Sequence, residues 1–210
     1  MEDQKRQVIE ETIENLRKNH MEAVYVENAA VLLPVLRGYL PDGARVTCGG
    51  SVTLQETGAK EELRRLGKTG AITFLDRDAE GADTARIFRE AFSCDVYVTG
   101  TNAVTRDGWL YNIDGNGNRV AAMIFGPKSV VVVAGYQKIV GTKADAMERL
   151  RNIAAPKNAQ RLQMHTPCAK TGRCMDCMSE DRICSSYVFL GRQQEPGRIK
   201  VILLGEKCGF

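Results

Sequence analysis

The strongest constraint in this 210-residue chain is a repeated order of short apolar strand, loop and helix. Residues 44–51 (ARVTCGGS) form a strand pattern that runs into glycines, and a helical pattern follows at 59–67. The same order returns in 71–76, 82–93 and 94–100. Strands that alternate with helices predict a largely parallel sheet with helices on both faces. In such sheets, ligands bind beyond the carboxyl ends of the strands.

The middle of the chain departs from this order. Residues 101–125 (TNAVTRDGWLYNIDGNGNRVAAMIF) hold two strand-like runs separated by DGNGN, a dense turn signal that predicts an antiparallel hairpin. After it, 126–135 predicts a buried strand and 142–154 a helix. The expected fold class is therefore α/β, with a mixed, largely parallel sheet, flanking helices and an antiparallel hairpin insert.

The last part of the chain has a different sequence pattern. Residues 164–183 show little hydrophobic periodicity, and two strand candidates at 185–190 and 198–205 follow them. We therefore expect an α/β domain over residues 1–163. Residues 164–210 are expected to form a cysteine-rich loop and terminal strands that pack on the same domain.

Charge and hydropathy exclude several classes of protein. Residues 1–20 are charged and helix-periodic, unlike a secretory signal, and no apolar run reaches the roughly eighteen residues of a membrane span. We therefore expect a cytoplasmic protein without a membrane span. The 29 basic and 26 acidic residues give a formal charge of +3 and are dispersed along the chain, so nucleic acid is not an expected partner.

Four of the seven cysteines lie within CAKTGRCMDCMSEDRIC, at Cys168, Cys174, Cys177 and Cys184. Where disulfides are rare, clustered cysteines more often bind metal or take part in redox chemistry. Cys174 and Cys177 can chelate one centre through a tight turn, and the outer two complete four thiolates. The spacing favours an iron–sulfur cluster, with structural zinc, free thiols or an adventitious disulfide as alternatives. The remaining cysteines are expected to be buried small side chains: Cys48, Cys94 and Cys208.

Two stretches resemble signature segments of the LUD (lactate utilisation) family, which includes the LutC-like and YkgG-like proteins. They are CGGSVTLQETG at 48–58 and TNAVTRDGWLYNIDGNGNRVAAMIFGPKSVVVVAGYQKIV at 101–140. The resemblance runs through most of residues 1–160. The four-cysteine motif and the terminal RIKVILLGE resemble a LUD subgroup found mainly in anaerobic bacteria. The resemblance implies a fold similar to that of ribose-phosphate isomerase, glucosamine-phosphate deaminase (NagB-like) and CoA transferases.

The resemblance also implies a function. The implied function is a redox accessory role in the oxidation of lactate or a related 2-hydroxy acid, with a small anionic metabolite as ligand. Other lactate-utilisation or electron-transfer proteins would be its partners. Two interpretations stay open beside it: an isomerase-like or CoA-transferase-like enzyme acting on a phosphorylated or acyl substrate, and a non-catalytic metabolite-binding regulator. A homo-oligomer is also left open. The chain has no hydrolytic triad, Rossmann fingerprint or Walker loop that we can identify.

The glycine loop is the first candidate ligand site. Gly49, Gly50 and Ser51 stand where a strand gives way to a helix, so backbone N–H groups there can hold a phosphate or carboxylate. A plain turn, with Ser51 as the helix cap, is the alternative. Glu56, on the same stretch, is a weak candidate for a base or nucleophile, and a structural or binding role is favoured for it.

The 101–140 segment is the second candidate site. Asn102 and Asp114 come from loop or turn positions, where their side chains can orient a small polar ligand, and the family resemblance favours them over their neighbours. Asp and Asn beside glycine also build tight turns, which is the alternative for DGNGN. Gly135 and Lys138 follow a buried strand and can meet an anionic ligand at the edge of the sheet. An exposed charge is the alternative for Lys138.

Overall fold

The computed structural model describes residues 2–210 and contains a main sheet of parallel strands. The order of its strands in space is β1 (Glu22–Val26), β10 (Ile199–Leu204), β7 (Ser129–Gly135), β4 (Val96–Gly100), β2 (Arg45–Cys48) and β3 (Thr73–Leu75). A smaller sheet has the order β8 (Ile139–Val140), β5 (Ala103–Thr105), β6 (Leu110–Asp114) and β9 (Ser186–Leu190). The main sheet is parallel at every strand pair and the smaller one is mixed, so the predicted fold class is confirmed.

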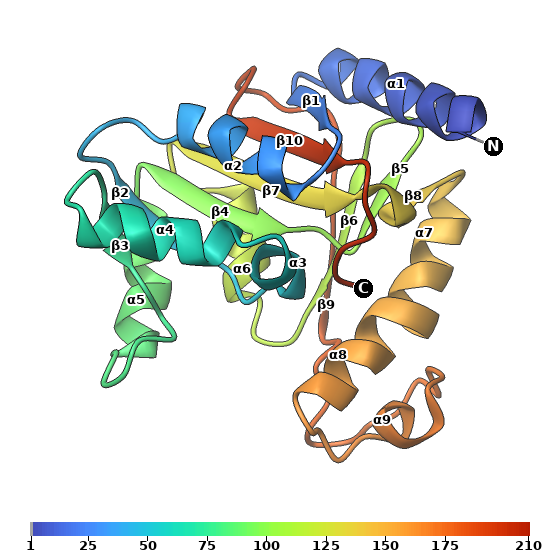
Figure 1. The fold of residues 1–210 in the computed structure, drawn as a ribbon. Helices are drawn as coiled ribbons and strands as arrows, with labels where there is room; N and C mark the ends of the chain where they lie inside the picture. Colours follow the sequence, from blue (N-terminus) through green and yellow to red (C-terminus); the bar gives the residue numbers. More distant parts are fainter. Residues whose placement is uncertain (1) are drawn as a thin grey trace.

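Helices flank the main sheet on both faces (Figure 1). In chain order the helical elements are α1 (Glu2–Lys18), α2 (Ala29–Gly38), α3 (Val52–Glu56), α4 (Ala59–Lys68), α5 (Thr84–Glu90), η1 (Ala91–Ser93), α6 (Asn118–Ile124), η2 (Tyr136–Lys138), α7 (Lys143–Arg149), η3 (Leu150–Ala154), α8 (Ala155–Arg161) and α9 (Pro167–Thr171).

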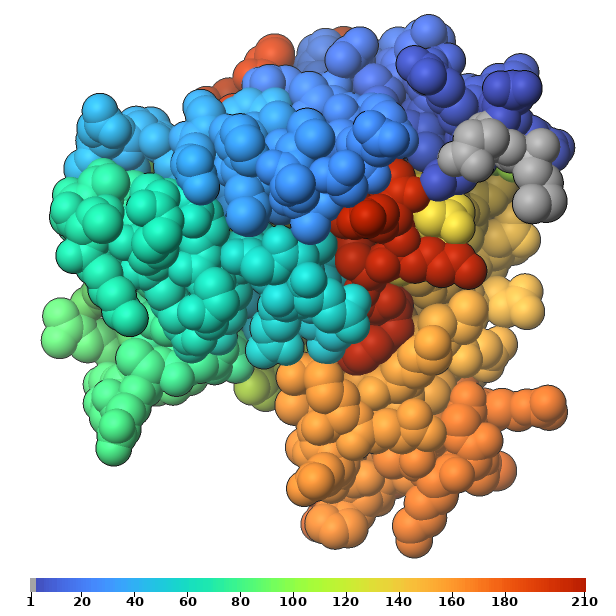
Figure 2. Space-filling model, viewed as in Figure 1, coloured from blue at the N-terminus to red at the C-terminus, as the bar shows by residue number. Residues whose placement is uncertain are grey.

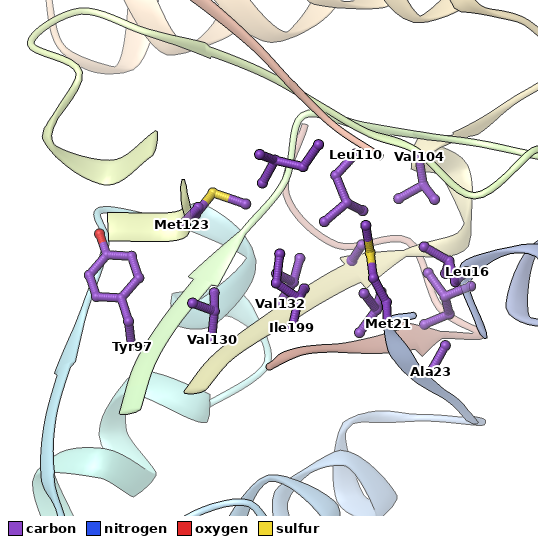
Figure 3. Close-up of a cluster of buried hydrophobic side chains, with 14 of the residues drawn as sticks. Leu16, Met21, Ala23, Tyr97, Val104, Leu110, Met123, Val130, Val132 and Ile199 are labelled. Carbon is purple, nitrogen blue, oxygen red and sulfur yellow. The ribbon is translucent and has the colours of Figure 1, made fainter. Parts of the chain in front are cut away.

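Strand β7 shows how the sequence buries both faces of the sheet. Val130 and Val132 pack into a cluster with α1, α6 and the smaller sheet, where Met123 lies close to them (Figure 3). Val131 and Val133 face the opposite cluster, which α2, α3 and α4 complete. All four valines are fully buried, and each such side chain contributes about 1.5–3 kcal/mol relative to exposure. A continuous apolar run is what a parallel strand needs when it is covered on both sides.

The predicted antiparallel hairpin is present, but its turn lies earlier in the chain than DGNGN. Strands β5 and β6 pair antiparallel across residues 106–109, where Gly108 has φ 80°. DGNGN instead ends β6 and begins α6, so the prediction of a strand after it is wrong. At this junction Gly117 has φ 78° and donates its N–H to Asp114. The apolar run that follows is short, and a short run does not by itself distinguish strand from helix.

The helix predicted at 142–154 is also present, and it extends further than expected. Thr142 and Asp145 form a capping box at its start. The π-helical turn η3 then joins α7 to α8, and the three form one continuous rod (Figure 1). Because Pro156 has no N–H to donate, a locally widened turn just before it lets the rod continue. The sequence pattern predicted that this helix ends at residue 154.

The terminal segment contributes a strand to each sheet. β9 pairs antiparallel with β6, and β10 lies between β1 and β7 (Figure 1). The apolar side chains of β10 are buried in the clusters on both faces of the main sheet, so this strand is part of the core. Within residues 2–210, the structure contains no helix with the length and hydropathy needed to cross a membrane.

Candidate functional site

A cleft of about 460 Å³ opens beyond the carboxyl ends of the main-sheet strands. The connections that follow the adjacent strands β2 and β4 leave the sheet on opposite faces, since α4 packs in one buried cluster and α6 in the other. In open α/β sheets a ligand crevice forms at such a point. Residues of α8 form the facing wall, and Figure 2 shows the surface indented between α5 and α8.

Five of the sequence-predicted ligand residues line this cleft, although they come from four separate segments: Gly50, Ser51, Asn102, Asp114 and Lys138. The parallel strands β2, β4 and β7 bring three of the segments together, because their carboxyl ends meet at one edge of the main sheet. Asp114 reaches the cleft from the end of β6 in the smaller sheet. The lining does not include Gly49, Gly135 or Glu56.

Lys138 is a buried amine in the cleft wall, not an exposed charge, with only 3% of its surface accessible. Its Nζ donates to Thr53 Oγ1 at 2.8 Å and to the Thr101 carbonyl at 3.2 Å. Among residues 2–210, no carboxylate forms an ion pair with it. Burial lowers the pKa of Lys138 to about 8, because the charged form is poorly solvated.

Arg149 is a second buried cation near Lys138. Only 6% of its surface is accessible, and its Nε and Nη1 have no hydrogen-bond partner in the described part of the chain. Burial lowers its pKa, and its positive charge also contributes to the lowered pKa of Lys138. Two buried cations without a paired carboxylate give this end of the cleft a positive potential.

Arg119, on α6, ties together three segments of the cleft wall. Its Nε pairs with Asp114 Oδ2 at 3.1 Å, and its Nη1 donates to Asn112 Oδ1 at 2.7 Å and to the Gly100 carbonyl at 3.3 Å. Its Nη2 donates to Asn102 Oδ1 at 3.1 Å and to the Ile113 carbonyl at 2.9 Å.

Asn102 and Asp114 are therefore held in place by other residues of the protein. Asn102 Oδ1 accepts from Arg119 and from the Ile113 backbone, which leaves the amide Nδ2 without a partner in the described chain. Both oxygens of Asp114 are used, one by Gly117 and one by Arg119. Asp114 thus stabilises the turn and the arginine, whereas Asn102 presents a donor to the cleft.

The glycine loop has both structural and cleft-facing positions. Ser51 caps α3, where its Oγ accepts from the Leu54 N–H at 3.3 Å. A side chain at Gly49 would begin 2.9 Å from Tyr97 Oη and 3.0 Å from Thr99 Oγ1, so this glycine is needed for packing. Gly50 and Ser51 both border the cleft.

Glu56 and Gly135 lie beneath the last residues of the chain. Glu56 Oε2 accepts the Gly209 N–H at 2.7 Å, so its carboxylate anchors the terminal segment. A Cβ at Gly135 would approach the Cys208 backbone nitrogen to 2.8 Å, which makes close packing the reason for this glycine. The structure thus gives both residues structural contacts.

The sequence did not single out four arginines that line the cleft: Arg77, Arg119, Arg161 and Arg182. Arg182 lies in the cysteine segment. Arg77 follows β3, so the rule that pointed to the loops after other strands could have found it. Arg119 was missed because the run after DGNGN was predicted to be a strand, whereas it forms α6. Arg161 lies beyond Pro156, where no helix was expected.

The four clustered cysteines do not form a ready-made metal site in this structure. Within the described residues, no group of three or more His, Cys, Asp or Glu side chains is arranged to hold a metal ion. Cys168 is buried on α9, with its Sγ 3.3 Å from Thr166 Oγ1, while the other three are partly exposed. Cys184 is near enough to Cys174 and Cys177 for their charges to raise its pKa, in addition to the larger effect of burial. The expectation of buried side chains at Cys48, Cys94 and Cys208 is confirmed.

Comparisons with known proteins identify relatives of the whole chain. The family model described as LUD domain matches residues 9–204. A solved structure of a DUF162 family protein from Deinococcus radiodurans, DUF162 being the former name of LUD, is similar with a TM-score of 0.58 and 15% identity. That match covers 96% of this chain and 98% of the other.

Two further structures are similar over part of their length. Ribose 5-phosphate isomerase from Plasmodium falciparum has a TM-score of 0.35 and 14% identity, covering 54% of this chain and 52% of the other. eIF2B beta from Chaetomium thermophilum has a TM-score of 0.41 and 10% identity, covering 56% and 44%. Among curated proteins, none matches the chain significantly.

Proposed function

Because the chain belongs to the LUD domain family, we propose that its cleft binds a small anionic metabolite in support of lactate or related 2-hydroxy-acid oxidation. In this proposal the protein is a redox accessory component that acts with other lactate-utilisation or electron-transfer proteins. The observation that carries the binding function is Lys138, a buried amine in the cleft wall that forms no ion pair within residues 2–210 and feels the negative charge of Glu56 only from a greater distance.

A 2-hydroxy carboxylate suits the donors that this cleft presents. A lysine ammonium has three N–H groups, and Lys138 uses two of them for Thr53 and Thr101, which leaves one for a carboxylate oxygen. Asn102 Nδ2 and the Ser51 hydroxyl are neutral donors on the same cleft for the second oxygen or the hydroxyl group. We assign these residues to binding and orientation of the metabolite, not to bond breaking.

Calorimetric titration with lactate, glycolate and propionate tests the binding function. We expect lactate and glycolate to bind, and propionate to bind more weakly because it lacks the hydroxyl group. Failure of all three to bind would contradict the proposal. Turnover of a sugar phosphate or an acyl-CoA without electron transfer would instead support the isomerase-like or CoA-transferase-like alternative. Ligand binding without turnover or electron transfer would support the regulator.

Lactate affinity should depend on pH through Lys138. Since the free protein has a Lys138 pKa of about 8, the amine is charged below that value and binds the carboxylate. Above it the proton must be taken up on binding, so affinity should fall by about tenfold per pH unit. Calorimetry across this range checks the slope, and Lys138→Met should remove it. A constant affinity in the unaltered protein would show that another group holds the anion.

A separate proposal concerns the cysteine segment. We propose that it holds an iron–sulfur cluster, or zinc as the alternative, once residues 172–185 draw together around Cys168. The proximity of three of the thiols and the lack of helix or strand in 172–185 support this proposal. The present arrangement would have to change, so no electron-transfer step is derived from it.

Metal analysis after anaerobic purification decides among these alternatives. We expect stoichiometric iron and sulfide with visible absorption, and their loss in the Cys174→Ser, Cys177→Ser double variant. Cys48→Ser, at a buried cysteine outside the segment, is the matched control and should keep the metal. Zinc alone would make the segment a structural site. Protein without any metal would exclude both an iron–sulfur cluster and a zinc ion in this segment.

A further inference from the structure

Two arginines from opposite walls of the cleft face the same space. Arg77 follows β3, and Arg161 is the last residue of α8; both line the cleft. They are near enough for the charge of Arg77 to lower the pKa of Arg161, in addition to the larger effect of partial burial. Two guanidinium groups repel each other unless an anion lies between them.

Arg77 is held over the glycine loop by its surroundings. A Cβ on Gly50 would lie 3.5 Å from Arg77 Nη1 and 3.6 Å from Nη2, so these donor atoms stand above the loop backbone. The guanidinium carbon also lies 4.9 Å from the centre of the Phe88 ring. This placement orders the arginine before any ligand arrives, which reduces the entropy lost on binding.

The carboxylate beside Arg77 does not neutralise the pair. Asp78 Oδ1 accepts from Arg77 Nε at 3.2 Å, while its other oxygen is bound to the buried amine of Lys60. Asp78 thus shares one charge between these two cations, and the same charge also acts on Arg161, whose pKa it raises. Arg161 directs Nε and Nη2 to Asn158 Oδ1, a neutral acceptor. The lining of the cleft also includes the carboxylates of Asp114, Glu180 and Asp181. Against these three stand five cationic side chains, so positive charge remains in excess: Arg77, Arg119, Lys138, Arg161 and Arg182.

We propose that Arg77 and Arg161 together bind a phosphate group, so that the ligand of this cleft is a phosphorylated small carboxylic acid. A phosphate monoester carries about two negative charges and three oxygens that point in different directions, so it can accept from two guanidinium groups at once. A planar carboxylate matches only one such group. The identity of the second anionic end rests on the proposed function, which places a carboxylate at Lys138.

Calorimetry with glycerate, 3-phosphoglycerate and inorganic phosphate tests this assignment. We expect 3-phosphoglycerate to bind at least about tenfold tighter than glycerate, because charge-assisted bidentate bonds are added. In the Arg77→Met, Arg161→Met double variant this gain should fall to less than about twofold, while glycerate affinity stays the same. Inorganic phosphate should bind the unaltered protein weakly and the double variant not at all.

The matched control removes two positive charges elsewhere. Arg6 and Lys128 are exposed and pair with Glu10 and Asp95, so the Arg6→Met, Lys128→Met variant should keep the full gain. A gain that survives in the Arg77, Arg161 double variant, or 3-phosphoglycerate that binds no tighter than glycerate, would overturn the assignment. Arginine-dependent binding of phosphate without any binding of glycerate would uphold the phosphate site at the two arginines and reject the carboxylate site at Lys138.

Discussion

Lys138→Met should lower the affinity for lactate by about 10- to 100-fold and at the same time stabilise the ligand-free protein. The loss follows because a hydrogen bond to a charged group contributes about 1.5–3 kcal/mol. The gain in stability follows because the buried amine has no carboxylate partner in the described chain, and burying an unpaired charge is costly. We expect the free energy of unfolding to rise by about 1–3 kcal/mol, as measured by urea denaturation.

The pH dependence of the free energy of unfolding independently tests whether Lys138 is a buried amine with a lowered pKa. The Lys138 pKa is lowered from 10.5 to about 8 on folding, so between these values the unfolded chain binds more protons than the folded one. The free energy of unfolding therefore rises as the pH increases from about 8 to 10.5. Below pH 8 the amine is charged in both states, so the full cost of burying the charge lowers the stability of the folded protein. The slope should disappear in Lys138→Met.

Lys60 supplies the matched control, because it is also a buried lysine but has carboxylate partners. Its amine pairs with Asp78 and lies 3.9 Å from Asp76. Lys60→Met should therefore destabilise the protein by about 3–5 kcal/mol, the range for breaking a buried pair. Equal destabilisation by both substitutions would mean that Lys138 is a structural residue and not a ligand-binding one.

The order of strands and helices explains why part of this fold could be predicted from the sequence. Alternation along the chain predicted the parallel sheet, and the valines of 130–133 marked a strand buried on both faces. The place of 199–204 between two strands from elsewhere in the chain could not be predicted in this way. Such pairing depends on packing between distant segments, which local periodicity does not record.

The candidate site was predictable to a similar degree. Residues directly after strands, such as Ser51 and Lys138, could be placed at one edge because parallel strands end together. Arg161 reaches the same cleft only because the π-helical turn carries the helix through Pro156. The hydrophobic pattern predicted that this helix ends at residue 154. Residue spacing therefore could not predict that the residues of α8 form a wall of the cleft.

Arg119→Met should cause the largest loss of stability among the substitutions at the cleft. The side chain is only 12% exposed and bonds to the Asp114 carboxylate, two asparagine side chains and two carbonyl groups. Its removal leaves Asp114 as a nearly buried charge and several acceptors without a donor, so unfolding should become easier by about 3–5 kcal/mol. Urea denaturation measures this difference.

Two further variants separate the network from a general effect of losing an arginine. Arg86→Met removes an arginine that is 70% exposed and paired with Glu90 one helical turn away, so it should cost no more than about 0.5 kcal/mol. In Arg119→Met, Asp114→Asn the unpaired charge is gone, and part of the lost stability should return. If Arg119→Met alone costs less than about 1 kcal/mol, water must replace the arginine at these acceptors and Asn102 does not depend on it for its orientation.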